Sequence, residues 1–138
     1  MNQLLVQQIW LRALHRCEYC RIPYPHYRLP FQVDHIIARQ HGGTTTLDNL
    51  AMACFHCNRF KGPNIAGLDP ASGELVRLFH PRTDLWTEHF RFDGARLVGL
   101  TPIGRATIRV LARTTFCSFV LKFCTKESFS LERQLLDW

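Results

Sequence analysis

Four of the six cysteines in this 138-residue chain occur as two matched pairs, and this spacing strongly limits the possible folds. Cys17 and Cys20 are separated by two residues, as are Cys54 and Cys57, and 33 residues lie between the pairs. Each C-x2-C pair can present both sulfurs to one ion, and two pairs complete a tetrahedral four-thiolate zinc site. Such a site leaves the zinc no open position, so we predict a structural ion. The alternative is a redox C-x-x-C motif beside unrelated thiols.

The composition narrows the class of protein. The chain carries 17 Lys and Arg against 11 Asp and Glu, and its net charge of +6 fits either a polyanionic partner or a simply basic soluble protein. The length fits one domain, and no apolar run approaches the roughly 18–20 residues of a membrane span. Without a visible secretion signal, the cysteines predict a reducing, cytoplasmic compartment. A membrane protein, a disulfide-rich miniprotein and a disordered tail are disfavoured.

The segment that holds the cysteine pairs predicts a strand–loop–strand–helix unit after an N-terminal helix. Apolar residues at helical spacing predict a helix over residues 4–16. Residues 29–33 are strand-like and run on toward residue 37, and a second apolar run covers residues 50–53. A short helix is expected from Cys54 to the Gly62-Pro63 stop.

Further along the chain the pattern changes to strands and one helix. Residues 74–79 alternate as a strand does, and residues 86–92 and 95–100 flank Asp93-Gly94, a strong hairpin signal. Thr101-Pro102 is typical of a helix start, and we expect that helix over residues 103–112.

Polar residues of catalytic type lie between and beside the cysteine pairs. Asp34 and His35 end the first predicted strand, Asn49 precedes the second, and Asn58 directly follows Cys57. A neutral imidazole can take a proton from water, and carboxylate and amide oxygens can hold a hard divalent cation. Taken singly, each has a simpler interpretation: His35 as a hydrogen-bonded core residue, Asn49 as a turn residue and Asn58 as a helix cap.

The combination of these motifs resembles the HNH endonuclease family over about residues 12–66. The resemblance rests on the two C-x2-C pairs, the run Phe31-Gln32-Val33-Asp34-His35-Ile36-Ile37, the loop His41-Gly42-Gly43, Leu47-Asp48-Asn49-Leu50, and Asn58-x2-Lys61-Gly62. It implies an α+β fold: a ββα-metal core clipped by zinc, with the N-terminal helix and a C-terminal β-hairpin and helix as extension. Segments beyond residue 66 also resemble the C-terminal extension of bacterial members.

The resemblance also implies roles for individual residues. His35 corresponds to the general base, Asp34 to a metal ligand, and Asn49 to the residue that holds the loop orienting His35. Asn58 takes the place of the usual final histidine as second metal ligand, and this departure suits Mg2+ (or Mn2+), since amide oxygen is a harder ligand than imidazole nitrogen. The implied reaction is hydrolysis of DNA phosphodiester bonds, with double-stranded DNA the expected substrate.

Three flanking cations are candidates for phosphate contacts. Arg39, Arg59 and Lys61 surround the expected site, although each alone could be a solvated surface charge. We therefore expect a DNA endonuclease; the alternatives are a zinc-stabilised nucleic-acid-binding module without catalysis and a purely structural zinc domain for protein contacts.

We expect three regions: a nuclease core in residues 1–66, an extension in residues 67–113, and an atypical tail in residues 114–138. In the tail, lysine replaces arginine as the main cation and phenylalanine is enriched. Helical spacing of its aromatic residues predicts a helix, with Cys117 and Cys124 as core thiols. The resemblance ends before the tail, so we expect it to lie outside the nuclease unit.

Overall fold

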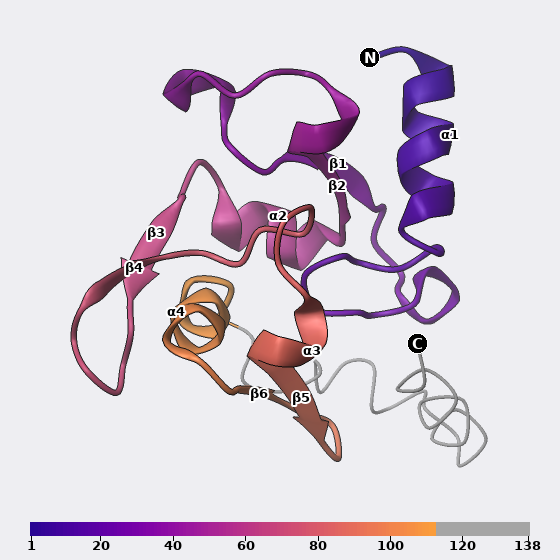
Figure 1. Cartoon of the computed structure of the whole chain (residues 1–138). Helices are drawn as coiled ribbons and strands as arrows, with labels where there is room; N and C mark the ends of the chain where they lie inside the picture. The colour runs from indigo at the N-terminus through magenta and orange to yellow at the C-terminus, as the bar shows by residue number, and fades with distance from the viewer. Residues whose placement is uncertain (113–138) are drawn as a thin grey trace.

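The chain folds into short helices and antiparallel strand pairs (Figure 1). The structure is a computed structural model and describes residues 1–112. Its helices are α1 (Gln3–Arg12), α2 (Phe55–Lys61), α3 (Trp86–His89) and α4 (Pro102–Val110). Its strands pair as β1 (Gln32–His35) with β2 (Leu50–Ala53), β3 (Ala66–Leu68) with β4 (Leu75–Arg77), and β5 (Phe90–Asp93) with β6 (Arg96–Gly99). The α+β class predicted from the sequence is confirmed, and the helix predicted for the tail lies outside the described residues.

The strand–loop–strand–helix unit forms as expected, but β1 covers Gln32–His35 and does not include residues 29–31 of the predicted strand. β1 and β2 run antiparallel, with Gln32 opposite Ala53 and His35 opposite Leu50. All four residues of β2 are buried because this apolar strand packs against both α1 and α2. The side chain of Cys54 caps α2, and Gly62, at a φ of 49°, ends it. The two residues of the Asp-His motif therefore lie at the end of a strand next to α2.

The N-terminal helix is shorter than predicted. Helix α1 ends at Arg12, whereas the apolar spacing predicted a helix to residue 16. Leu14 and His15 adopt positive φ angles of 52° and 57°, so the chain reverses there before it reaches the first cysteine pair. Ile9 and Ala13 pack with Leu50 and Met52 in a small core of their own.

The first part of the extension also differs from expectation. Residues 86–92 were predicted as one strand, but residues 86–89 form the single-turn helix α3. The physical reason is the spacing of the two aromatic residues: Trp86 and Phe90 are four apart and both buried, with ring centroids 5.3 Å apart. A strand would place Glu88 on the same buried face. Strand β4 is shorter than the predicted 74–79, and its partner β3 was not predicted.

The hairpin and the last helix agree with the prediction. β5 and β6 pair around Asp93-Gly94, and Gly94 has a φ of 57°. Thr101 caps α4 by accepting a hydrogen bond from Gly104 N at 3.1 Å. A Cβ on Gly104 would lie 2.1 Å from the carbonyl oxygen of His89, so glycine permits the close approach of α4 to the end of α3.

A buried ion pair joins the β3–β4 hairpin to α4. The carboxylate of Asp69, fully buried, accepts hydrogen bonds from Arg105 Nε and Nη2, both at 2.8 Å. These hydrogen bonds hold the pKa of Asp69 well below its usual range, although burial opposes the shift. The two-pronged contact fixes the hairpin on the helix.

One buried cluster links the cysteine segment to the extension. It contains the four paired cysteines together with Trp86 of α3, Phe90 of β5, Leu97 of β6, Ile108 of α4 and Leu111, which directly follows α4. In Figure 1 the extension lies beside α2, on the side away from the long loop between β1 and β2. The division at residue 66 stays a prediction. Within residues 1–112, every helix is too short or too polar to cross a membrane.

Candidate active site and metal centre

The two cysteine pairs meet as the sequence predicts. One sulfur from each of Cys17, Cys20, Cys54 and Cys57 lies within 4.8 Å of the other three, and all four side chains are buried. The Cys20 and Cys54 sulfurs are 3.8 Å apart. Two thiolates bound to one zinc at about 2.3 Å in tetrahedral geometry lie about 3.8 Å apart, so the cluster fits such an ion. The four cysteines form a site for a structural metal ion such as zinc.

Burial disfavours ionised thiols in this cluster when only protein atoms surround them. It raises the pKa of Cys17 well above the usual thiol range, and hydrogen bonds among the sulfurs raise that of Cys57. A bound dication reverses this preference because it binds the thiolate form. Metal binding and folding of this segment are therefore coupled.

Three of the four residues predicted as catalytic line one cleft, and Asn49 is not among its lining residues. Asp34 and His35 from β1 and Asn58 from α2 border it, together with Arg39 from the loop that follows β1. The cleft has a volume of about 310 Å³. The remaining lining residues are Val33, Ala38, Gln40, Gly62 and Pro63. The structure thus brings together three residue types that can take a proton and hold a divalent cation.

Asp34 is the most constrained member of the cleft. Its side chain is 6% exposed, and its Oδ2 accepts a hydrogen bond from the Tyr19 hydroxyl at 2.6 Å. Lys61 Nζ lies 3.0 Å from the same oxygen and 3.4 Å from Oδ1. Burial raises the pKa of Asp34, while Lys61 and Tyr19 pull it down. Two donors on one oxygen fix the plane of the carboxylate.

His35 is held by a loop threonine. Its Nε2 lies 2.9 Å from Thr45 Oγ1, while its backbone oxygen accepts a hydrogen bond from Lys61 Nζ at 3.0 Å. The side chain is half-buried at the rim of the cleft. With Nε2 bonded to Thr45, Nδ1 is the ring nitrogen left to exchange a proton with a water molecule.

Asn58 is oriented by a residue of the neighbouring strand. Its Nδ2 donates a hydrogen bond to Gln32 Oε1 at 2.5 Å. Because the amide nitrogen is used in this way, the amide oxygen is the end left for a cation. Gln32 and Asp34 are two apart on β1 and therefore share a face of the strand.

Asn49 closes the loop between the strands. Its Oδ1 accepts from Ile37 N at 2.9 Å, and its Nδ2 donates to Ile37 O at 2.9 Å and to Thr44 O at 2.8 Å. Gly43 packs directly beneath this clamp, where a Cβ would lie 1.7 Å from Ile37 O. The three hydrogen bonds fix the chain two residues after His35.

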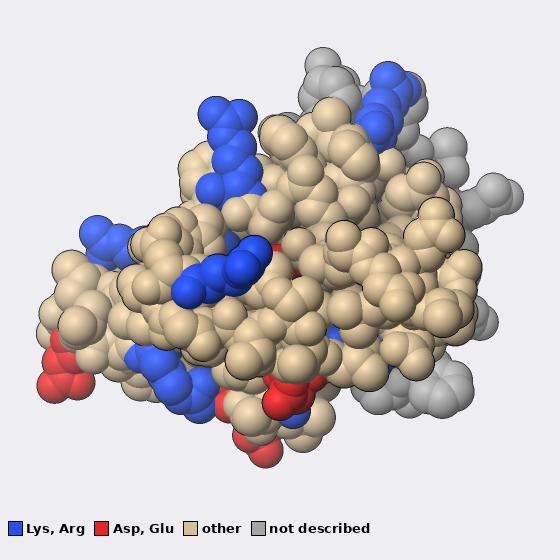
Figure 2. All heavy atoms as spheres, turned by 90° about the horizontal axis from the view of Figure 1, so that it is seen from above, with Lys and Arg blue, Asp and Glu red and all other residues tan. Residues whose placement is uncertain are grey.

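The three predicted phosphate contacts lie in different environments. Arg39 is exposed and lines the cleft, and Arg59 is exposed on α2 outside the cleft lining. Lys61 is only 2% exposed, and its ammonium faces inward to Asp34. This burial leaves Lys61 no surface for a phosphate contact, contrary to the expectation from the sequence. On the face seen from above in Figure 2, Lys and Arg side chains stand apart among neutral residues.

A family model described as HNH endonuclease matches residues 17–64. This segment begins at the first ligand cysteine and contains β1, β2 and α2, the elements that build the cleft. Residues 17–64 belong to the HNH endonuclease family. No curated protein and no solved structure matches the chain.

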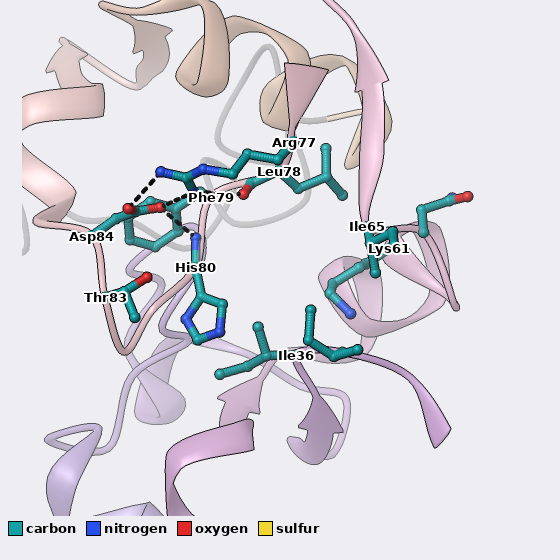
Figure 3. Close-up of a pocket in the computed structure, with 11 residues that line it drawn as sticks. Ile36, Lys61, Ile65, Arg77, Leu78, Phe79, His80, Thr83 and Asp84 are labelled. Atoms are coloured by element: carbon teal, nitrogen blue, oxygen red, sulfur yellow. Dashed lines mark hydrogen bonds and ion pairs between the residues drawn. The ribbon is translucent and has the colours of Figure 1, made fainter. Parts of the chain in front are cut away.

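A second cavity lies where the HNH segment meets the extension. It has a volume of about 350 Å³, and Ile36 and Lys61 form one wall. In Figure 3 the ring of His80 points into the cavity from the opposite side, near the paired side chains of Arg77 and Asp84. The extension therefore comes close to the stem of Lys61.

Sequence reasoning missed three side chains that contact the expected site residues. They are Tyr19, Gln32 and Thr45, which contact Asp34, Asn58 and His35. Strand alternation was the available signal for Gln32, since it lies two residues before Asp34. Tyr19 and Thr45 reach the site through the tertiary fold, and local pattern gives no sign of them.

Proposed function

We propose that the protein is a metal-dependent endonuclease that hydrolyses phosphodiester bonds in DNA. The observation that carries the proposal is the single cleft, within an HNH segment, lined by Asp34, His35 and Asn58. A binding module would not require an imidazole beside two oxygen ligands. Double-stranded DNA is the expected substrate.

His35 acts as the general base in this proposal. In the tautomer that the mechanism requires, Nε2 donates to Thr45 Oγ1, 2.9 Å away, and Nδ1 accepts a proton from the attacking water molecule. Asn49 holds the loop that follows His35 and so keeps the ring in place. Positioned proton transfer contributes roughly 10²–10⁴-fold to a rate.

Asp34 and Asn58 would hold one divalent metal ion, preferably Mg2+ or Mn2+. Carboxylate and amide oxygens are ligands that hard cations prefer. When bound, such an ion supplies neutralisation of charge on the scissile phosphate and stabilises the leaving oxygen. Lys61 keeps Asp34 in one orientation, and Gln32 does the same for Asn58.

Arg39 and Arg59 would contact phosphates of the substrate, Arg39 at the cleft and Arg59 from the exposed surface of α2, next to Asn58. Lys61, which the sequence suggested as a phosphate contact, instead forms an ion pair with Asp34. The zinc expected at the four cysteines is structural, because four thiolates leave no open position for a reactant.

The experiment that tests this proposal is cleavage of supercoiled plasmid with Mg2+ or Mn2+, with EDTA as control. We expect His35→Ala to abolish cleavage while zinc content, melting temperature and DNA affinity stay close to those of the parent. Affinity is preserved because it comes mainly from Arg and Lys contacts to phosphates. His41→Ala, at an exposed histidine in the loop between β1 and β2 that does not line the cleft, is the matched control and should cut normally.

Two results would overturn the nuclease proposal: no cleavage by the parent with any of several divalent metals, or cleavage by His35→Ala at the parent rate. DNA binding without cleavage would then favour the zinc-stabilised binding module.

Substitutions at Asn58 test the metal site separately. We expect Asn58→Ala to need more Mg2+ or Mn2+ for half-maximal cleavage, because one oxygen ligand is lost. Asn58→His should remain active with a changed order of metal preference, since imidazole nitrogen suits softer ions better than Mg2+. The measurement is the cleavage rate against metal concentration for Mg2+, Mn2+ and Ni2+. An unchanged metal profile in both variants would exclude Asn58 as a ligand.

A further inference from the structure

The first cysteine pair is linked to the proposed metal ligand Asp34 by the side chain of Tyr19. Tyr19 lies between Cys17 and Cys20 and is 1% exposed. Its hydroxyl donates the 2.6 Å hydrogen bond to Asp34 Oδ2. A hydrogen bond this short to a buried carboxylate restricts the rotation of that carboxylate strongly.

The pattern of donors around Asp34 leaves one oxygen available. Oδ2 accepts hydrogen bonds from Tyr19 at 2.6 Å and Lys61 at 3.0 Å, whereas Oδ1 has, within residues 1–112, only the 3.4 Å contact with Lys61. A carboxylate held through one oxygen presents the other in a fixed direction. Oδ1 is therefore the atom available to a cation in the cleft.

Residues of the extension contact the backbone carbonyl of Tyr19 and the side chains of Arg21 and Glu18. Trp86 Nε1 donates a buried hydrogen bond to the carbonyl oxygen of Tyr19 at 2.8 Å. The guanidinium carbon of Arg21 lies 5.4 Å from the centre of the Trp86 ring system. Arg82 forms an ion pair with Glu18, whose other carboxylate oxygen accepts from Met52 N at 2.7 Å.

These contacts form one continuous path from α3 to the cleft. It runs from the indole of Trp86 to the backbone of Tyr19, then through the phenol to Asp34. Every group on the path is buried, so water cannot replace a lost hydrogen bond easily.

We propose that Tyr19 is a positioning residue that presents Asp34 to the divalent cation, and that Trp86 of the extension holds Tyr19 for this task. The inference rests on the proposed function in one respect, that Asp34 is a metal ligand. It gives the extension a role: supporting the metal site through the first cysteine pair. Hydrogen-bonding partners of metal ligands affect metal affinity in this way in many proteins.

The test measures Mn2+ binding to the zinc-loaded full chain by the electron paramagnetic resonance signal of free Mn2+. We expect Tyr19→Phe to weaken Mn2+ binding by roughly tenfold, with zinc content unchanged. Trp86→Phe keeps an aromatic ring but removes the donor, and should weaken binding less and in the same direction. Tyr24→Phe, at an exposed tyrosine beyond the second ligand cysteine, is the matched control and should bind Mn2+ as the parent does.

A cleavage assay separates positioning from a general loss of structure. For Tyr19→Phe, the metal concentration for half-maximal cleavage should rise while the rate at saturating Mn2+ stays near that of the parent. Parent-like Mn2+ affinity in Tyr19→Phe would overturn the proposal, and so would loss of zinc from this variant. If Tyr19→Phe proves insoluble, parent-like affinity in Trp86→Phe overturns it.

DNA cleavage tests the proposed function separately from the positioning role of Tyr19, which Mn2+ binding tests. A parent protein that binds Mn2+ through Asp34, loses affinity in Tyr19→Phe and cuts no DNA would refute the nuclease proposal but support the positioning role. A parent that binds no Mn2+ would overturn both.

Discussion

At the scale of single residues, the ion pair between Asp34 and Lys61 is the most consequential contact of the cleft. Both side chains are almost completely buried, with exposures of 6% and 2%. Placing two charges in the interior carries a large desolvation cost, which their attraction and the surrounding hydrogen bonds must offset. Lys61 also bonds the backbone oxygen of His35, so one ammonium organises both residues of the Asp-His motif.

Removal of the Lys61 charge should therefore destabilise the protein strongly. We expect Lys61→Met to lower the free energy of unfolding by about 3–5 kcal/mol, because Asp34 is left as a buried carboxylate without a cation. Arg59→Met, an exposed cation on the same helix, is the control and should change stability little. Denaturant titration at constant zinc measures both variants.

A double variant sharpens this prediction. Asp34→Asn in the Lys61→Met background removes the unpaired charge and should recover part of the lost stability. Equal stability of Lys61→Met and Arg59→Met would contradict the assigned burial of the pair.

At the scale of elements, the sequence predicted those helices and strands whose signature lies within a few neighbouring residues. The cysteine spacing, the two strands of the HNH segment, the Asp93-Gly94 hairpin and the cap of α4 all have signatures within a few residues. The early end of α1 does not, because it depends on the reversal that brings Cys17 to the second pair. The local sequence pattern could not predict the burial of Lys61 either, because its partner Asp34 lies 27 residues away in the chain.

The loop between β1 and β2 depends on one side chain for its shape. Asn49 supplies three hydrogen bonds to backbone groups of Ile37 and Thr44, and it is buried. We expect Asn49→Asp, which keeps the size, to lower the free energy of unfolding by about 1–3 kcal/mol, because the carbonyls of Ile37 and Thr44 lose their donor. Cleavage should fall as well, since His35 lies two residues before Ile37.

The control for this loop is Asn64→Asp, the same change at an exposed asparagine. Thermal unfolding and plasmid cleavage should separate the two variants. Similar melting temperatures for both variants would mean that the hydrogen bonds of Asn49 contribute little to the stability of the protein.

At the scale of the whole molecule, the metal centre and the extension share one core. The four ligand cysteines pack in the same buried cluster as Trp86, Phe90, Leu97 and Leu111. Arg82 and Trp86 also contact Glu18 and Tyr19, the two residues between Cys17 and Cys20. Residues 67–112 are thus joined to the HNH segment by packing as well as by the chain.

Metal removal should consequently loosen the extension as well as the cysteine segment. A structural zinc site contributes its binding free energy to folding, so chelation or Cys54→Ser should destabilise everything that packs on the cluster. Hydrogen exchange is the measurement: we expect faster exchange in β5, β6 and α4 as well as in β2 and α2. The control is Cys117→Ser, at a cysteine outside the two C-x2-C pairs. This variant should retain its zinc and exchange its amide hydrogens as slowly as the parent. Full protection of β5, β6 and α4 after zinc loss would instead show that the extension folds on its own, with the predicted boundary at residue 66 as a true domain boundary.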